Sequence, residues 1–166
     1  MGETISVQMT EDALYDFMLY HTYSKLAGFL VNVLGVTVGL VGIFMRFTGK
    51  ITLVQLLFYL IAAIIFLAYT PLQIRFRARK LIKTSREYQE PKIYNFSEEG
   101  ILVTQNQEQK YGWEQVQRVV AAPKTFGFYY GENDALIIPK ESFGEQYMPI
   151  MKIVTAHVSP DRIRLR

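Results

Sequence analysis

The chain has 166 residues, enough for about one domain, and half of them are hydrophobic, with a mean hydropathy of +0.11. Its 18 basic and 15 acidic residues give a modest net charge of +3. It contains no cysteine, which excludes disulfides, thiolate catalysis and thiolate zinc sites.

The first residues predict a short strand followed by a helix. Ile5, Val7 and Met9 alternate with polar residues, which is the period of a half-buried strand. Thr10 is a typical helix N-cap, and the acidic residues after it suit the positive end of a helix dipole. We expect the helix to run to about Tyr23, so that residues 1–25 form a cytoplasmic strand and helix leading into a membrane.

Two long uncharged segments come next. Residues 26–45 and 51–74 contain no charged side chain, over 20 and 24 residues respectively. A helix of about 20 residues reaches roughly 30 Å, the thickness of the hydrocarbon core of a bilayer. We therefore predict two transmembrane helices over these ranges, joined as an antiparallel hairpin by an extracytoplasmic connector at residues 46–50.

A cluster of basic residues follows the second segment, in a predicted juxtamembrane helix at residues 75–90. Its members are Arg75, Arg77, Arg79, Lys80, Lys83 and Arg86. Because the connector holds only two basic residues, the positive-inside rule predicts that both termini are cytoplasmic. The cluster either serves this orientation alone or also contacts anionic lipid headgroups, which is worth up to about 1 kcal/mol per residue.

Small residues form a stripe along the first predicted span. The stripe consists of Gly28, Asn32, Gly35, Gly39 and Gly42. Small residues four apart let helix backbones approach closely in a membrane. The stripe is compatible with packing against the second span and with a homodimer interface, and the sequence leaves both interpretations open. Neither span contains an ionisable residue, which argues against a pump or a proton-coupled carrier.

The rest of the chain predicts a β-rich domain that ends in a helix. Strands are expected at 92–96, 101–105, 110–114, 116–120, 125–130 and 135–139. A helix is expected from Lys140 to about Val158, bent or split at Pro149, before a basic and mobile tail at 159–166. With the strand before the hairpin, this makes seven antiparallel strands in two sheets capped by a C-terminal helix, as in a PH-like sandwich or half-barrel. The predicted class is thus an α+β membrane protein.

The sequence offers no catalytic constellation. The two histidines, His21 and His157, lie far apart in the sequence, and no nucleotide or phosphate-binding motif is present. We therefore predict that the chain is not an enzyme and has no catalytic residues, cofactor or metal site. Because the basic residues gather beside the predicted membrane, bilayer phosphate is the expected polyanion, and nucleic acid is not an expected partner.

Several segments, taken in order, resemble a known family. They are Thr10–Asp12 with Phe17 and His21, the paired spans, YNFSEEG at 94–100, WEQV at 113–116 and IIPKESF at 137–143. In this order they resemble the YcxB-like family of bacterial membrane proteins. The resemblance implies a bacterial cell-membrane protein with a PH-like domain at residues 91–158, and it implies no established reaction.

Three positions shared with the family have predicted structural roles. Trp113 is expected to anchor a sheet, and its indole N–H needs a partner if it is buried. Gly100 suits a turn with positive φ, and Pro139 suits the end of a strand before a helix. The leading functional hypothesis is a non-catalytic module that binds a lipid headgroup, an unknown protein partner or a second copy of itself. The alternative is a small membrane subunit that oligomerises into, or regulates, a pore or transporter complex.

Overall fold

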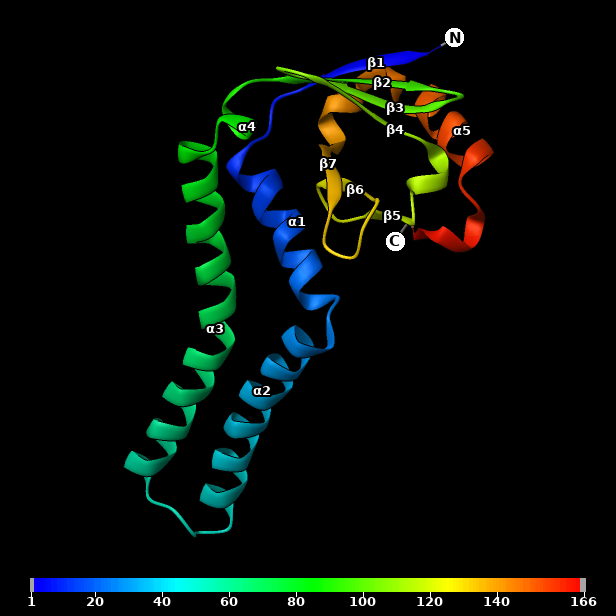
Figure 1. The fold of residues 1–166 in the computed structure, drawn as a ribbon. Helices are drawn as coiled ribbons and strands as arrows, with labels where there is room; N and C mark the ends of the chain where they lie inside the picture. Colours follow the sequence, from blue (N-terminus) through cyan, green and yellow to red (C-terminus); the bar gives the residue numbers. More distant parts are fainter. Residues whose placement is uncertain (1, 165–166) are drawn as a thin grey trace. The chain divides into compact units, whose positions relative to one another are not determined.

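The computed structural model describes residues 2–164, and these divide into two compact units (Figure 1). The first, here called the helical unit, is Met18–Arg77. The second, here called the sheet unit, combines the residues up to Phe17 with those from Ala78 onward. Two helices, α1 (Glu11–Tyr23) and α3 (Leu53–Thr84), each contribute residues to both units.

The helical unit contains α2 (Leu26–Phe47), which is joined to α3 by residues 48–52. Near the start of the connector, Gly49 closes the last turn of α2 with a φ of +72° and an N–H bond of 3.1 Å to the Arg46 carbonyl. The connector ends in a capping box: Thr52 Oγ1 accepts the Gln55 N–H at 3.3 Å, and Gln55 Oε1 accepts the Thr52 N–H at 2.8 Å. These two signals place the connector slightly later than the predicted range of 46–50.

The second apolar helix is longer than the predicted span. It continues through Pro71 and ends at Thr84. After Ser85, a single short helix, α4 (Arg86–Gln89), leads into the sheet unit. The predicted juxtamembrane helix at 75–90 is therefore two helices, with Ser85 in an extended conformation between them.

The first sheet of the sheet unit is wholly antiparallel. Its order is β1 (Glu3–Val7), β2 (Lys92–Ser97), β3 (Gly100–Thr104) and β4 (Glu108–Tyr111). Ile5 lies opposite Tyr94, which lies opposite Val103, so these inward side chains form one row across three strands. The strand predicted before the hairpin thus pairs with a strand that follows it.

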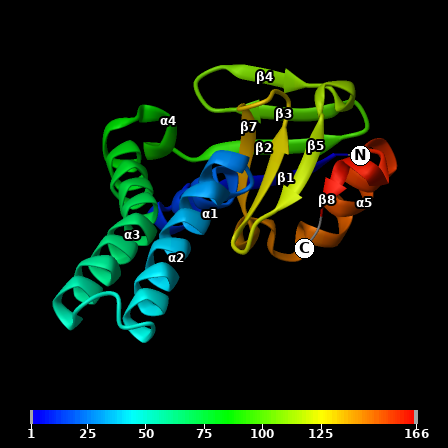
Figure 2. The same ribbon diagram turned by 90° about the horizontal axis from the view of Figure 1, so that it is seen from below.

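The second sheet contains one parallel pair. Its order is β7 (Ala135–Pro139), β6 (Thr125–Tyr129), β5 (Arg118–Ala121) and β8 (Ile163–Arg164). Figure 2 shows its strands running across those of the first sheet. Because β8 is parallel to β5, the prediction of a purely antiparallel domain is wrong for this pair. The tail was predicted to be mobile, but residues 160–164 form a 3₁₀ turn and this strand; residues 165–166 lie outside the described range.

The core lies between the two sheets and under α5 (Tyr147–His157), which covers one open side of them (Figures 1 and 2). Phe96 and Phe128 face each other from opposite sheets with ring centroids 5.7 Å apart. From α5, Ile150 and Val154 complete this core with no exposed surface. The sheet unit therefore has a hydrophobic core of its own.

The predicted helix from Lys140 to Val158 begins later than expected. Residues Lys140–Gln146 form a 3₁₀ segment, and the break falls at Gly144, with φ of 48° and ψ of −130°. Only glycine adopts such angles readily, so it marks the break better than Pro149 does. Pro149 lies in the first turn of α5, where a missing N–H removes no helical bond.

The start of α1 is fixed to the second sheet. Thr10 is its N-cap, as predicted, with Oγ1 accepting the Ala13 N–H at 3.2 Å. The carboxylate Oδ2 of Asp16 accepts two bonds at the start of β6, from Lys124 N at 2.9 Å and from Thr125 Oγ1 at 3.1 Å. Thr125 is fully buried, so this bond satisfies a hydroxyl that water cannot reach.

Candidate binding site between the two sheets

A cavity of about 130 Å³ lies inside the sheet unit. Alternation along β2 explains its position, since Lys92, Tyr94 and Phe96 share one face. Phe96 is fully buried in the core, whereas Lys92 is the first residue of β2 and places a polar side chain on the same inward face. The cavity is lined there by β1, α4, β2, β3, β4 and the β6–β7 hairpin: Val7, Met9, Glu87, Tyr88, Glu90, Lys92, Tyr94, Val103, Gln109, Tyr111, Tyr130, Ala135, Leu136 and Ile137.

Glutamine side chains hold α4 at the edge of this cavity. Gln8 Nε2 donates to the Tyr88 carbonyl at 3.0 Å. Gln105 Nε2 donates to the carbonyls of Glu87 and Glu90, each at 3.1 Å. Because these three bonds go to backbone atoms, they fix the path of the short helix and leave the glutamate and tyrosine side chains available to line the cavity.

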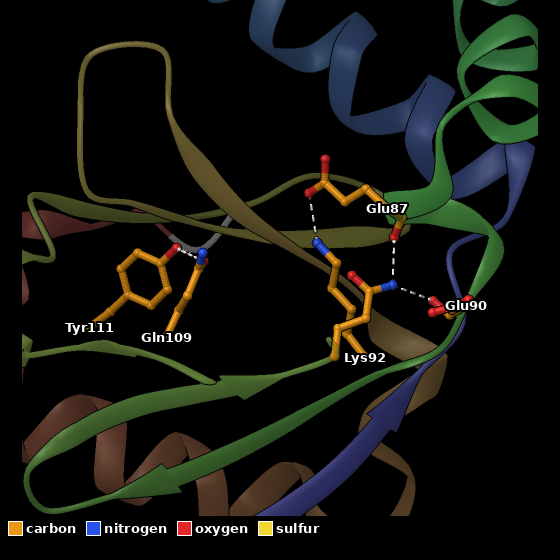
Figure 3. A network of polar contacts seen from close by, with 6 residues as sticks. Glu87, Glu90, Lys92, Gln109 and Tyr111 are labelled. Carbon is orange, nitrogen blue, oxygen red and sulfur yellow. Dashed lines mark hydrogen bonds and ion pairs between the residues drawn. The ribbon is translucent and has the colours of Figure 1, made fainter. Parts of the chain in front are cut away.

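An ion pair lies within the lining. Lys92 Nζ donates to Glu87 Oε1 at 2.6 Å (Figure 3). The same ammonium lies 6.0 Å from the centroid of the Tyr88 ring, within the range of a cation–π contact. The Lys92 side chain is 19% exposed and that of Glu87 is 55% exposed, so the lysine is the more enclosed partner. Glu90, an exposed residue, also lines the cavity.

Four tyrosines supply most of the aromatic surface. The rings of Tyr111 and Tyr130 lie 4.8 Å apart, and the Tyr111 hydroxyl donates to Gln109 Oε1 at 2.9 Å (Figure 3). Burial raises the pKa of Tyr94 well above its usual value. Burial, together with the neighbouring Tyr111, raises the pKa of Tyr130 to about 12. Burial and then the charge of Glu87 raise the pKa of Tyr88. Tyr88, Tyr94 and Tyr130 therefore keep their hydroxyl protons at physiological pH and can donate hydrogen bonds.

Among the described residues that line the cavity there is no histidine, serine or threonine. Across residues 2–164, no group of three or more His, Asp or Glu side chains is placed to hold a metal ion. The arrangement can therefore enclose a small group, hydrogen-bond to it and attract charge.

The predicted basic cluster lies outside this cavity. Arg75, Arg77, Arg79, Lys80 and Lys83 are exposed on α3, and Arg86 is exposed at the start of α4. Arg79 also pairs with Glu11, with Nε 3.1 Å from both carboxylate oxygens. Glu11, the acidic partner, lies in the first turn of α1, within the sheet unit.

Part of the glycine stripe faces α3 of the same chain. A Cβ atom added to Gly42 would lie 2.5 Å from Tyr59 Cβ, and one added to Gly35 would lie 3.0 Å from the Leu67 side chain. At Gly39 the nearest atom is Ala63 Cβ at 3.3 Å. In the helical unit, these glycines therefore allow close approach of α2 and α3.

The other two members of the stripe behave differently. Gly28 packs against the backbone of Thr22, before α2, and Asn32 is partly exposed.

The three predicted structural residues occupy distinct positions. Trp113 lies in a 3₁₀ turn, Trp113–Gln115, and not in the predicted strand at 110–114, because β4 ends at Tyr111. It is buried, its indole N–H donates to the Ser97 carbonyl at 2.9 Å, and its ring stacks on His157. Gly100 has φ of +140° and Pro139 is the buried last residue of β7.

Sequence reasoning missed the cavity and its tyrosines. The available signal was the placement of polar and aromatic residues at alternate positions, Lys92 with Tyr94 and Gln109 with Tyr111. This alternation shows that each pair shares a face of its strand. It does not show that the two faces enclose one space, which depends on the crossing of the sheets.

The fold and the cavity define an α+β protein in which two long apolar helices are inserted into the sequence of a two-sheet domain. Residues 96–152 match a family model described as YcxB-like protein. This match confirms the resemblance to the YcxB-like family indicated by the sequence, over this segment of the chain. The matched residues run from the end of β2 into α5. No curated protein and no solved structure matches the chain.

Proposed function

We propose that this chain is a two-span membrane protein that presents a non-catalytic, PH-like binding domain at the cytoplasmic face of a bacterial cell membrane. The observation that carries the proposal is the exposure of the two apolar helices. Only 22% of the most apolar window of α2 and 6% of that of α3 are buried within the chain. The core helices of a soluble protein would be mostly buried, because soluble monomers rarely expose apolar patches larger than a few hundred Å².

The placement of charge supports the proposed orientation. The six basic residues of the predicted juxtamembrane segment are all exposed and follow the apolar part of α3. The 48–52 connector contains one basic residue, Lys50, and Arg46 lies in the last turn of α2. By the positive-inside rule this asymmetry favours a connector outside the cell and both termini inside. Anionic headgroups then become the nearest partners of the exposed cluster.

The architecture of the sheet unit supports the PH-like description. Two crossing sheets enclose one core, and α5 covers one open side (Figure 2). The short parallel strand β8 is an addition to the seven strands expected for such a domain. The cavity beside α4 gives this domain a place to bind a small group, and its tyrosines supply aromatic and hydrogen-bonding surface for that group.

Single-cysteine labelling tests this function directly, because the native chain contains no cysteine. Thr48→Cys places a thiol in the connector, and Gln107→Cys places one in the exposed turn between β3 and β4. In intact cells, a membrane-impermeant maleimide is expected to label only the first variant. After permeabilisation it should label both.

The matched control is the unmodified chain, which should not react in either condition. Recovery of the protein in the soluble fraction after alkaline carbonate extraction would contradict the membrane assignment. Labelling of Gln107→Cys in intact cells, with Thr48→Cys protected, would reverse the orientation.

A further inference from the structure

We propose that the cavity between the sheets binds a substituted ammonium group, as found in amines and in the headgroups of choline or ethanolamine lipids. The proposal rests on the proposed function only in treating this cavity as the ligand site of the binding domain. The same chemistry could come from a soluble amine or from a lipid headgroup.

The charge of the lining selects a cation. Its ionisable residues besides tyrosine are Glu87, Glu90 and Lys92. The Lys92 ammonium already pairs with Glu87 at 2.6 Å, so Glu90 gives the residues of the lining a formal excess of one negative charge. An anion would have to compete with Glu87 for the single lysine of the lining.

The aromatic surface favours the same class of ligand. A tyrosine ring attracts cations to its face through its quadrupole, and this is the physical basis of aromatic cages for alkylated ammonium groups. The cavity already contains one such contact, the Lys92 ammonium 6.0 Å from the Tyr88 centroid. Tyr111 and Tyr130 add two further rings to the lining, with centroids 4.8 Å apart.

The size of the cavity limits the ligand to a small group. Its volume of about 130 Å³ is close to that of the roughly 150 Å³ protein cavity known to hold one benzene molecule. An alkylammonium group fits a space of this order, whereas a nucleotide or a folded peptide segment does not. For a lipid, only the headgroup would enter, with the rest of the molecule remaining outside.

Lys92 acts as an internal competitor in this arrangement. Its ammonium occupies the position between the Glu87 carboxylate and the Tyr88 ring, where a ligand cation gains both interactions. A ligand therefore displaces the lysine head, which reaches water at the exposed edge of the cavity because its flexible stem allows it. Removing the lysine charge should strengthen binding, which loss of folding cannot mimic.

The test is calorimetric titration of choline into the full chain in a maltoside detergent, compared with the neutral tert-butyl analogue in which carbon replaces nitrogen. Choline is expected to bind and the analogue to bind at least about tenfold more weakly. Lys92→Met should tighten choline binding several-fold. Glu87→Gln should weaken it about tenfold, Tyr88→Leu should weaken it several-fold, and Tyr88→Phe should retain it.

Glu99→Gln is the matched control, because it removes a carboxylate paired with Lys110 on the same sheet but outside the cavity. It should leave choline binding unchanged. Fluorescence of the single tryptophan, Trp113, reports that each variant keeps its core. Absence of choline binding, equal binding of the neutral analogue, or weaker binding by Lys92→Met would overturn the proposal, and none of these results bears on the membrane topology.

Nanodiscs distinguish the two sources of the ammonium group. If phosphatidylethanolamine discs reduce choline affinity relative to phosphatidylglycerol discs, the lipid headgroup occupies the cavity. Equal affinity in both discs assigns the site to a soluble amine.

Discussion

The Asp16–Thr125 contact provides a quantitative test of how α1 is attached to the second sheet. Asp16→Ala removes the acceptor for Thr125 Oγ1 and for Lys124 N. The Thr125 side chain is fully buried, so its hydroxyl would lose its partner without gaining water, at a cost of about 1–3 kcal/mol. The Lys124 N–H lies in an exposed turn, where water can replace the lost bond at little cost.

A double-mutant cycle isolates this cost. Thr125→Val replaces the hydroxyl with a methyl group of similar shape and should destabilise the sheet unit by about 1 kcal/mol. In the double variant no buried hydroxyl is left unpaired, so the two single effects should not add. We expect a coupling energy of about 1–2 kcal/mol. The assay is chemical denaturation of the full chain in detergent, followed by Trp113 fluorescence.

The exposed pair formed by Glu99 and Lys110 is the comparison cycle. Both side chains are largely solvated, so their coupling should be much smaller than that of Asp16 and Thr125. Additive effects at Asp16 and Thr125, within about 0.5 kcal/mol, would refute the reasoning, because they would mean that the buried hydroxyl does not depend on the carboxylate.

Three further predictions concern other parts of the chain. Gly42→Leu should separate α2 from α3, because even a Cβ atom at Gly42 would lie 2.5 Å from Tyr59, whereas the Cβ of Gly39→Ala would lie 3.3 Å from its nearest neighbour. In thermal unfolding in detergent, Gly42→Leu should therefore lower the midpoint more than Gly39→Ala does. Equal midpoints for the two variants would contradict the packing. Trp113→Phe should cost about 1–3 kcal/mol by removing the indole donor of a buried hydrogen bond, measured by denaturation followed by circular dichroism; a change within about 0.5 kcal/mol would contradict this role. Burial raises the pKa of Tyr130 to about 12, so the contribution of this residue to stability is complete below about pH 10 and is lost as the pH rises toward 12. The thermal midpoint should therefore fall over this pH range, and Tyr130→Phe should make the fall less steep. An unaltered pH profile in this variant would contradict the prediction.

The elements read most reliably from the sequence were those with a local physical signal. The absence of charge over 26–45 and 51–74 corresponds to the two long helices, and Thr10 caps α1 as expected. The need of Trp113 for a partner also followed from chemistry alone, and Ser97 supplies it. In each case the signal lies within a few residues or in a property of one side chain.

What could not be predicted depends on distant parts of the chain. Strand β8 has two residues, too few for any period, and it forms only because β5 offers an edge. The cavity combines residues from β1, α4 and the β6–β7 hairpin, and Lys92 taken alone resembles an ordinary solvated lysine at the start of a strand. Its enclosure follows from the crossing of two sheets, which periodicity does not encode.

The pairing of β1 with β2 has a consequence for biosynthesis. The ribosome makes β1 before both apolar helices and its partner β2 only after them, so the first sheet cannot close until the hairpin has been translated. If the hairpin enters the bilayer as it emerges from the ribosome, insertion precedes closure of the sheet. Closure then joins the segment that precedes the first apolar helix to the segment that follows the second. A fragment that starts after the second helix would leave one edge of β2 unpaired and prone to self-association.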